Sequence, residues 1–91
     1  MGYPIKHDAE AGLFTSTVEG QLSLLQYRFR DGVMKIVHTE VPADLAGHGI
    51  ASDLMRAALE TARANGWRVI TACSYAKTFL ERHPEYADLL A

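Results

Sequence analysis

The chain has 91 residues, of which 48% are hydrophobic and 22% are charged, and its net charge is −2. This length allows one domain with one core, so we expect a single domain over residues 1–91, with enough apolar content to fold. A near-neutral chain is poorly suited to bind nucleic acid through bulk electrostatics, and the single cysteine, Cys73, excludes both an intramolecular disulfide and a four-thiolate zinc site.

Strand-forming residues and tight turns dominate the first forty positions. After a lead-in over residues 1–11 that we expect to be irregular, three segments are rich in β-branched, aromatic and aliphatic residues. Glu19-Gly20 and Asp31-Gly32 separate these segments, and Asp31-Gly32 tolerates the positive φ of a hairpin turn. The sequence therefore predicts an antiparallel meander of three strands, at residues 13–18, 22–30 and 33–39.

The hydrophobic period changes after Pro42, which cannot continue a central strand. Apolar residues then recur every three to four positions, which predicts a helix that ends at Asn65-Gly66. Residues 67–72 form a short strand, and Ser74 is the expected cap of a second helix that runs to about Arg82. The strand–helix–strand crossover makes the last strand parallel to the third. The predicted fold class is α+β, in the order βββαβα, with a mixed sheet and helices packed on it.

The segment from Val41 to Ala51 joins the third strand to the first helix and carries two glycines, Gly47 and Gly49. Uncovered backbone N–H groups at a helix N-terminus carry a partial positive charge, which suits a phosphate or pyrophosphate. No Gly-Lys-Ser/Thr sequence follows, and the third glycine of the dinucleotide-binding motif is absent. Two interpretations stay open, a phosphate-binding loop and a connector that only turns the chain.

Four short motifs occur in an order that points to one family. They are His38-Thr39-Glu40-Val41-Pro42, Gly47-His48-Gly49-Ile50-Ala51, Cys73-Ser74-Tyr75 and Arg82-His83-Pro84-Glu85-Tyr86. Together they resemble the very small members of the GNAT acetyltransferase superfamily, over nearly the whole chain. The resemblance implies a GNAT fold in which acetyl-CoA lies between two parallel strands that splay apart, here residues 33–39 and 67–72.

The resemblance also implies which residues bind the cofactor. The pyrophosphate loop of the family, Gln/Arg-x-x-Gly-x-Gly/Ala, aligns with six residues: Ala46, Gly47, His48, Gly49, Ile50 and Ala51. Ala46 stands where Gln or Arg is usual, so one side-chain contact to the pyrophosphate is lost, and His48 could restore part of the charge. The pantetheine arm is expected to pair with the main chain from Thr39 to Val41. Tyr75 and Lys77 could touch the pantetheine or the phosphates, or they could be surface residues of a short helix, which is the interpretation that we favour for Lys77.

Cys73 is the first candidate for the chemistry. It follows a strand and precedes a helix, whose N-terminus favours a thiolate, and the resemblance implies a catalytic cysteine here. The thiol could accept the acetyl group or protonate the departing CoA thiolate, and a buried structural cysteine is the alternative. His38 and Glu40 are candidate general bases. Strand parity puts His38 on the side of Met34 and Ile36, so a core histidine fits equally well.

These residues predict an acetyl-CoA-dependent N-acetyltransferase that acts on an unidentified amine. A CoA-binding module without efficient catalysis, or a scaffold bound to a partner, is the alternative, because so short a chain has little to enclose an acceptor unless residues 2–10 or a homodimer supply the wall. The four histidines lack metal-ligand spacing, so no metal is expected. No apolar run approaches the roughly 20 residues of a membrane span, and residues 1–10 lack a signal-peptide core, so we expect a cytoplasmic protein with no membrane or nucleic-acid partner.

Overall fold

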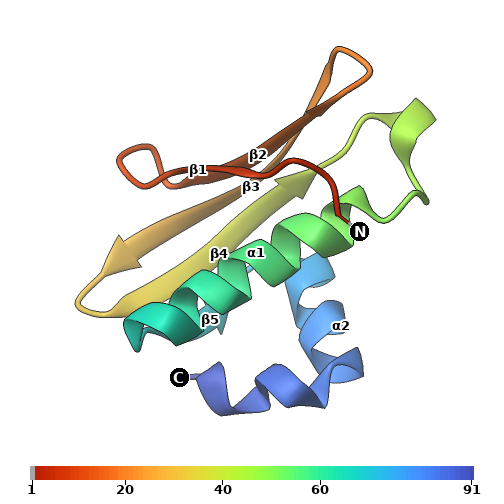
Figure 1. Ribbon diagram of the computed structural model, residues 1–91. Helices are drawn as coiled ribbons and strands as arrows, with labels where there is room; N and C mark the ends of the chain where they lie inside the picture. Colours follow the sequence, from red (N-terminus) through yellow and green to blue (C-terminus); the bar gives the residue numbers. More distant parts are fainter. Residues whose placement is uncertain (1) are drawn as a thin grey trace.

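The computed structural model describes residues 2–91, and its centre is one five-stranded sheet in the order β1-β2-β3-β4-β5 (Figure 1). The first four strands are antiparallel, and β5 runs parallel to β4 after the crossover through α1. The expected α+β class with a mixed sheet is confirmed. The elements are β1 Lys6–Asp8, β2 Leu13–Val18, β3 Gln21–Arg30, β4 Val33–Glu40, the 3-10 helix η1 Ala43–Leu45, α1 Ile50–Asn65, β5 Arg68–Thr71, α2 Ser74–Arg82 and the 3-10 helix η2 Pro84–Leu89.

The lead-in is not irregular throughout, contrary to the prediction from the sequence. Strand β1 pairs antiparallel with β2 at the edge of the sheet. All three of its residues are exposed, so no hydrophobic alternation signals the strand. The ring of His7 stacks on Phe14 with 4.1 Å between ring centroids, and its Nε2 lies 2.7 Å from the Tyr27 hydroxyl, which holds β1 to the sheet. Met1 lies outside the described residues.

The helices cover one face of the sheet and leave the other face uncovered. Helix α1 lies across the sheet with its apolar stripe inward, and α2 and η2 pack beside it (Figure 1). On β3, Leu25 and Tyr27 are buried on the helix side, whereas Leu22 on the opposite face is 53% exposed. The driving force is the burial of apolar surface, at about 25 cal/mol per Å². The buried core consists of Phe14, Leu25, Tyr27, Met34, Ile36, Leu45, Ile50, Leu54, Met55, Ala58, Leu59, Ala62, Val69, Ala76, Phe79, Leu80, Tyr86 and Leu89.

A β-bulge in β4 decides which side chains face the helices. Gln26 pairs with His38 but Tyr27 pairs with Ile36, so Val37 is an extra residue on β4. An extra residue reverses the alternation of side chains beyond it. His38 therefore lies on the uncovered face with Gln26. The prediction from strand parity, which placed His38 on the core side with Ile36, is wrong because the sequence gives no sign of the bulge.

The bulge also marks the place where β4 and β5 part. Their parallel register ends at the pair Ile36–Thr71, and the N–H of Ala72 donates to the Ile36 carbonyl at 2.8 Å. Beyond this point Val37–Glu40 of β4 has no β5 neighbour, and the chain after β5 enters α2. The β4–β5 pairing therefore ends at the bulge, which leaves the main chain of Val37–Glu40 without a strand partner on that edge.

Helix α2 is capped by Cys73 and not by Ser74, which the sequence had suggested. Cys73 has extended backbone angles, and its Sγ accepts a hydrogen bond from the N–H of Ala76 at 3.5 Å. At the other end of α2, Nδ1 of His83 lies 2.7 Å from the Phe79 carbonyl and closes the helix. Cys73 therefore has a structural role whatever its chemistry.

Candidate functional site

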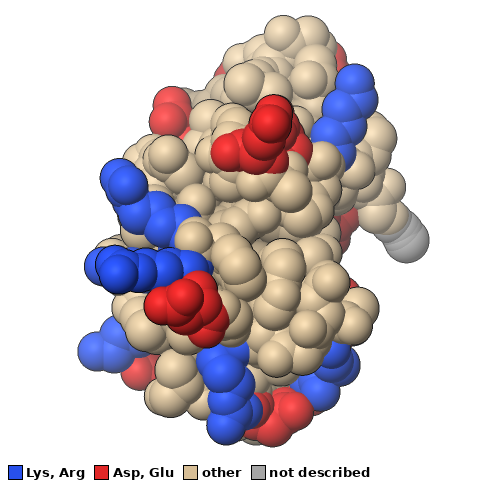
Figure 2. Space-filling model, turned by 90° about the vertical axis from the view of Figure 1, so that its left-hand side faces the viewer, with Lys and Arg blue, Asp and Glu red and all other residues tan. Residues whose placement is uncertain are grey.

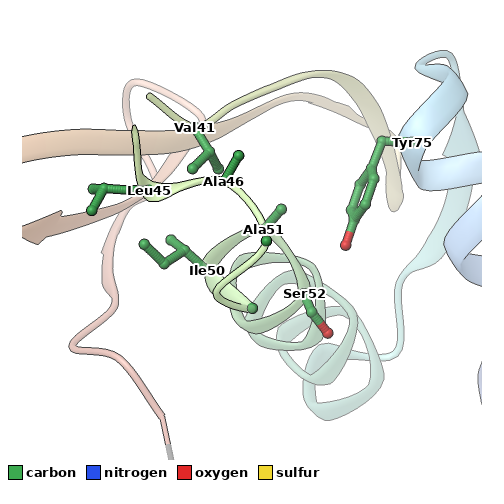
Figure 3. A pocket seen from close by; sticks show the side chains of 9 residues that line it. Val41, Leu45, Ala46, Ile50, Ala51, Ser52 and Tyr75 are labelled. Carbon is green, nitrogen blue, oxygen red and sulfur yellow. The ribbon is translucent and has the colours of Figure 1, made fainter. Parts of the chain in front are cut away.

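A cavity of about 250 Å³ opens at the N-terminus of α1 (Figure 3). Its walls are the loop that follows β4, the first turn of α1, and Tyr75 at the start of α2. Except for Leu45 and Ser52, each lining residue was expected from the sequence to contact the cofactor. The lining residues are Val41, Leu45, Ala46, Gly47, Gly49, Ile50, Ala51, Ser52 and Tyr75.

Two glycines shape the loop side of this cavity. Gly47 and Gly49 have φ angles of +83° and +86°, in the left-handed region, and no atom lies within 4 Å of the position that a Cβ would take. Gly49 is also the N-cap of α1 and offers no side-chain hydrogen bond, so the first N–H groups of the helix lack a capping partner. These N–H groups and the helix dipole make the loop side electropositive, with room for a ligand at the backbone.

The opposite wall carries two hydroxyl groups. Tyr75 extends from α2 toward the first turn of α1, where Ser52 lies (Figure 3). Burial raises the pKa of Tyr75, while the nearby positive charge of Arg56 partly opposes this shift. The phenol therefore stays protonated at neutral pH and can donate a hydrogen bond.

Leu45 and Ser52 line the cavity although the sequence had not suggested them. Leu45 is buried as the last residue of η1, a short 3-10 turn that sequence patterns seldom reveal. Ser52 lies three residues after Gly49, one helical turn beyond it on the same side of α1. The position of Ser52 could therefore have been predicted from helical periodicity, whereas that of Leu45 could not.

Arg56 brings a positive charge close to Tyr75, one of the residues that line the cavity. It lies one turn beyond Ser52 on α1, its guanidinium is 5.6 Å from the centroid of the Phe79 ring, and its charge acts on Tyr75. Its ion pair with Glu85 is long, at 3.9 Å, and both side chains are about half exposed. Such a pair holds the guanidinium weakly, but Arg56 does not itself line the cavity, and its positive charge also acts on Tyr86.

Cys73 lies where β4 and β5 diverge. Its Sγ is 3.9 Å from Oγ1 of Thr39, and both residues are half-buried. Because Sγ also accepts the N–H of Ala76, it lies at the N-terminus of α2. The thiol can therefore serve as an acid or a nucleophile at the end of the gap between the strands, in addition to capping α2.

The structure separates four other candidates from the cavity. His38 and Glu40 face the uncovered side of the sheet, with 3.2 Å between Nε2 and Oε1, and both side chains are more than half exposed. His48 lines a separate depression, where its carbonyl accepts a hydrogen bond of 2.6 Å from the Tyr3 hydroxyl. Lys77 lines another cavity, of about 420 Å³, beside the end of β5. His48 is therefore not positioned to replace the charge missing at Ala46.

Within residues 2–91, no group of three or more His, Cys, Asp or Glu side chains is arranged to hold a metal ion. None of the helices formed by these residues is both long enough and apolar enough to cross a membrane.

Residues 13–89 match the sequence model of a family described as GCN5-related N-acetyl-transferase. The chain belongs to this family. A relative, Protein NATD1 of Bos taurus, is 32% identical over 89 residues, which cover 92% of this chain and 79% of the relative. The NMR solution structure of a GCN5-like chain from Staphylococcus aureus is 32% identical, with a TM-score of 0.78 over 99% of this chain and 89% of that one. The expected membership of the GNAT superfamily and the expected fold are confirmed.

Proposed function

We propose that this GNAT protein transfers an acetyl group from acetyl-CoA to an amine, and that the cavity at α1 receives the pyrophosphate of the donor. The observation that carries the proposal is the uncapped N-terminus of α1 at Gly49, with open space beside the backbone. Family membership supports the reaction class and the donor. Acetyl-CoA supplies the acetyl group as an activated thioester, and the residues of the chain bind and orient it.

Backbone N–H groups at the start of α1 are the proposed ligands of the pyrophosphate. A helix N-terminus binds such an anion through its free N–H groups and its dipole. Ala46 adds no side-chain donor at the position where the family usually has Gln or Arg. We assign the compensating charge to Arg56, because a guanidinium can bind a phosphate through two hydrogen bonds and Arg56 is only loosely paired with Glu85. The hydroxyls of Ser52 and Tyr75 supply further donors.

The main chain of β4 beyond the bulge is the proposed path of the pantetheine arm. Val37–Glu40 has no β5 neighbour, so its N–H and C=O groups on that edge can pair with the amide groups of the arm. Val41, Leu45 and Ile50 supply an apolar wall where this path leaves the cavity. Followed along β4, the path reaches Thr39 and, beside it, the thiol of Cys73.

Cys73 and His38 flank the end of this path from opposite faces of the sheet. In the direct route, the amine nitrogen bonds to the thioester carbon as the carbon–sulfur bond breaks. His38, oriented by Glu40, then takes the proton from the amine, and Cys73 gives a proton to the departing sulfur. In a second route, Sγ of Cys73 bonds to the thioester carbon as the carbon–sulfur bond to CoA breaks, and the proton of the thiol passes to the departing CoA sulfur. The amine nitrogen then bonds to the same carbon as the bond from that carbon to Sγ breaks, and the amine proton passes to Sγ.

A CoA-binding module without efficient catalysis is the second candidate function. The observation that favours it is the position of His38 on the face of the sheet opposite to Cys73. A base on that face reaches the acceptor only if the gap between β4 and β5 exposes the thioester to both sides. Without that exposure, the same residues would bind the donor and leave the acetyl group in place.

Calorimetric titration with acetyl-CoA tests the donor site. Gly49→Ala places a methyl group at the proposed pyrophosphate site, and we expect it to weaken binding at least about tenfold, because overpacking at a contact commonly costs more than 1 kcal/mol. Gly66→Ala is the matched control. Gly66 caps the other end of α1, has a φ of +72°, and likewise has no atom within 4 Å of a Cβ. Since both variants carry a similar backbone cost, of about 1–2 kcal/mol, equal affinities in the two would contradict the site.

Thiol release from acetyl-CoA distinguishes the two candidate functions. Hydroxylamine serves as a small nitrogen acceptor, and the rate of a protein-free blank is subtracted. Release above the blank that falls in His38→Ala supports the transferase. Binding of acetyl-CoA without release supports the binding module, and an acetyl group found on Cys73 by mass spectrometry selects the route through the thiol.

A further inference from the structure

The uncovered face of the sheet carries a cluster of basic and apolar side chains near the turn between β3 and β4. The register sets them in two rows across three strands: Arg28, Lys35 and Ile70 in one row, and Arg30, Val33 and Arg68 in the next. Ile70 is 42% exposed, and Val33 is partly exposed beside it. A shallow depression of about 460 Å³, lined by five of these residues and Asp31, lies over the cluster, while Arg68 donates to the Asp88 carbonyl. We call these two rows the basic face.

The cations of the basic face are poorly compensated within the chain. Arg28 and Lys35 stand directly opposite each other on neighbouring strands, an arrangement that destabilises a sheet. No ion pair among residues 2–91 reaches either of them. Arg30 is 3.7 Å from Asp31, but the two side chains are 92% and 88% exposed, so solvent screens the pair. Repulsion between these uncompensated charges lowers the stability of the sheet, and an anionic partner would relieve it.

The charges also stand out on the surface. In Figure 2, Lys and Arg side chains project along the left-hand edge of the molecule, with acidic groups beside only some of them. The chain as a whole has a net charge of −2, so the positive charge of the basic face is opposite in sign to the net charge of the protein. Exposed aliphatic surface at Val33 and Ile70 lies between the cations of the basic face. A partner for this surface must therefore supply both negative charge and apolar side chains.

We propose that the basic face docks an extended acidic segment of a partner polypeptide, with its carboxylates on Arg28 and Lys35 and its apolar side chains on Val33 and Ile70. Charge complementarity sets the sign of the partner. A polypeptide fits better than a nucleic acid, because a phosphodiester backbone has no aliphatic side chains to cover Val33 and Ile70. A second copy of this chain fits poorly, since a two-fold contact would place the same cations against each other. The proposal does not depend on acetyl-CoA or on acetyl transfer.

The test uses the whole chain and a defined probe without acetyl-CoA. The probe is a fluorescein-labelled peptide that repeats the sequence Glu-Ser-Leu-Ser. In an extended conformation this places Glu and Leu on one side. A matched peptide carries Lys in place of Glu, and a labelled oligouridine of similar length represents nucleic acid. Fluorescence anisotropy measures the binding of all three.

Single charge reversals then locate the binding. Arg28→Glu and Lys35→Glu are each expected to weaken binding of the acidic peptide at least about tenfold, because a like charge replaces an opposite one at the contact. Arg82→Glu, which makes the same change in net charge at the exposed end of α2, is expected to change it less than about threefold, because bulk charge is largely screened at physiological salt. Circular dichroism melts verify that each variant is folded.

Binding of the acidic peptide alone, lost in the two face variants and kept in Arg82→Glu, supports the proposal. Equal binding of the acidic and basic peptides, equal loss in all three variants, or no binding of the acidic peptide overturns it. Tighter binding of the oligouridine, lost in the same two variants, also overturns it and assigns the face to a nucleic acid.

Discussion

Substitutions of Cys73 can distinguish its role as the cap of α2 from its proposed role in acetyl transfer. Sγ caps α2 by accepting the N–H of Ala76 at 3.5 Å, and the same atom lies 3.9 Å from Oγ1 of Thr39 at the end of the gap between β4 and β5. Serine retains a hydrogen-bond acceptor at the cap but is a far weaker acid and nucleophile than a thiol. Alanine removes both functions. The pair Cys73→Ser and Cys73→Ala therefore distinguishes a loss of capping from a loss of chemistry.

The expected size of each effect follows from this geometry. A hydrogen bond of 3.5 Å to sulfur is a weak cap, so Cys73→Ala should cost about 0.5 kcal/mol, the low end of the range for N-cap deletion. Cys73→Ser should gain a similar amount, because a hydroxyl is a preferred N-cap. For a domain of this size, about 0.5 kcal/mol corresponds to a shift of about 2–4 °C in Tm. Loss of a general acid should lower the rate by about 10²–10⁴.

Thermal melts and initial rates of thiol release, with acetyl-CoA and hydroxylamine, measure the two effects side by side. We expect Cys73→Ser to melt at or above the temperature of the parent chain and to lose at least about a hundredfold in kcat/KM. A Cys73→Ser variant that keeps its kcat/KM within about threefold would refute a chemical role for the thiol. A fall of more than about 4 °C in its Tm would refute the capping argument.

Four further predictions rest on separate parts of the structure. Ser16 and Ser23 lie opposite each other in the core, and within residues 2–91 neither hydroxyl has a hydrogen-bond partner. Replacement of both by Ala should therefore raise the free energy of unfolding, measured by denaturant titration, by about 1 kcal/mol. A lower free energy of unfolding would indicate that the two hydroxyls are hydrogen-bonded. Arg63, bonded at 2.9 Å and 3.1 Å, lowers the pKa of Asp88 below its ordinary value of 3.8, so the stabilisation is present above about pH 4 and is lost as the pH falls through the lowered pKa. Asp88→Asn should therefore lower Tm more at pH 7 than near pH 2, and an equal decrease at both pH values would contradict this linkage. Arg28→Glu should stabilise the sheet by about 0.5 kcal/mol, because it converts a repulsive cross-strand pair with Lys35 into an attractive one, and a lower Tm would contradict that register. Arg56→Ala should weaken acetyl-CoA binding at least about fivefold in calorimetry with the fold intact, because one charged hydrogen bond is lost, while unchanged affinity would remove Arg56 from the donor site.

Local patterns in the sequence were sufficient for most of the secondary structure. The hairpin turn at Asp31-Gly32, the helix that Gly66 ends and the short strand after it were all predicted, because φ preferences and hydrophobic periods act over a few neighbouring residues. Strand β1 was not predicted. Its residues are exposed and carry no hydrophobic period, so its pairing with β2 depends on contacts that are distant in sequence.

The sequence also predicted some parts of the candidate site correctly and others wrongly. The glycine loop was recognisable because positive φ values and a helix start leave local marks, and its residues line the cavity together with Tyr75. The position of His38 was predicted wrongly, since one extra residue at Val37 reverses the side that all later residues of β4 face.

By itself, the sequence determined the order of the strands and α-helices from β2 to α2, the glycine loop and the family, because each depends on residues close together in the chain or on short motifs. Only the tertiary structure decided that Cys73 caps α2 beside Thr39, that Arg56 brings its charge to Tyr75, and that one face of the sheet stays uncovered with opposed cations on it. These features arise where strands and helices far apart in sequence pack together. The register of the sheet and the side on which helices pack fix them, and neither can be read from local periodicity.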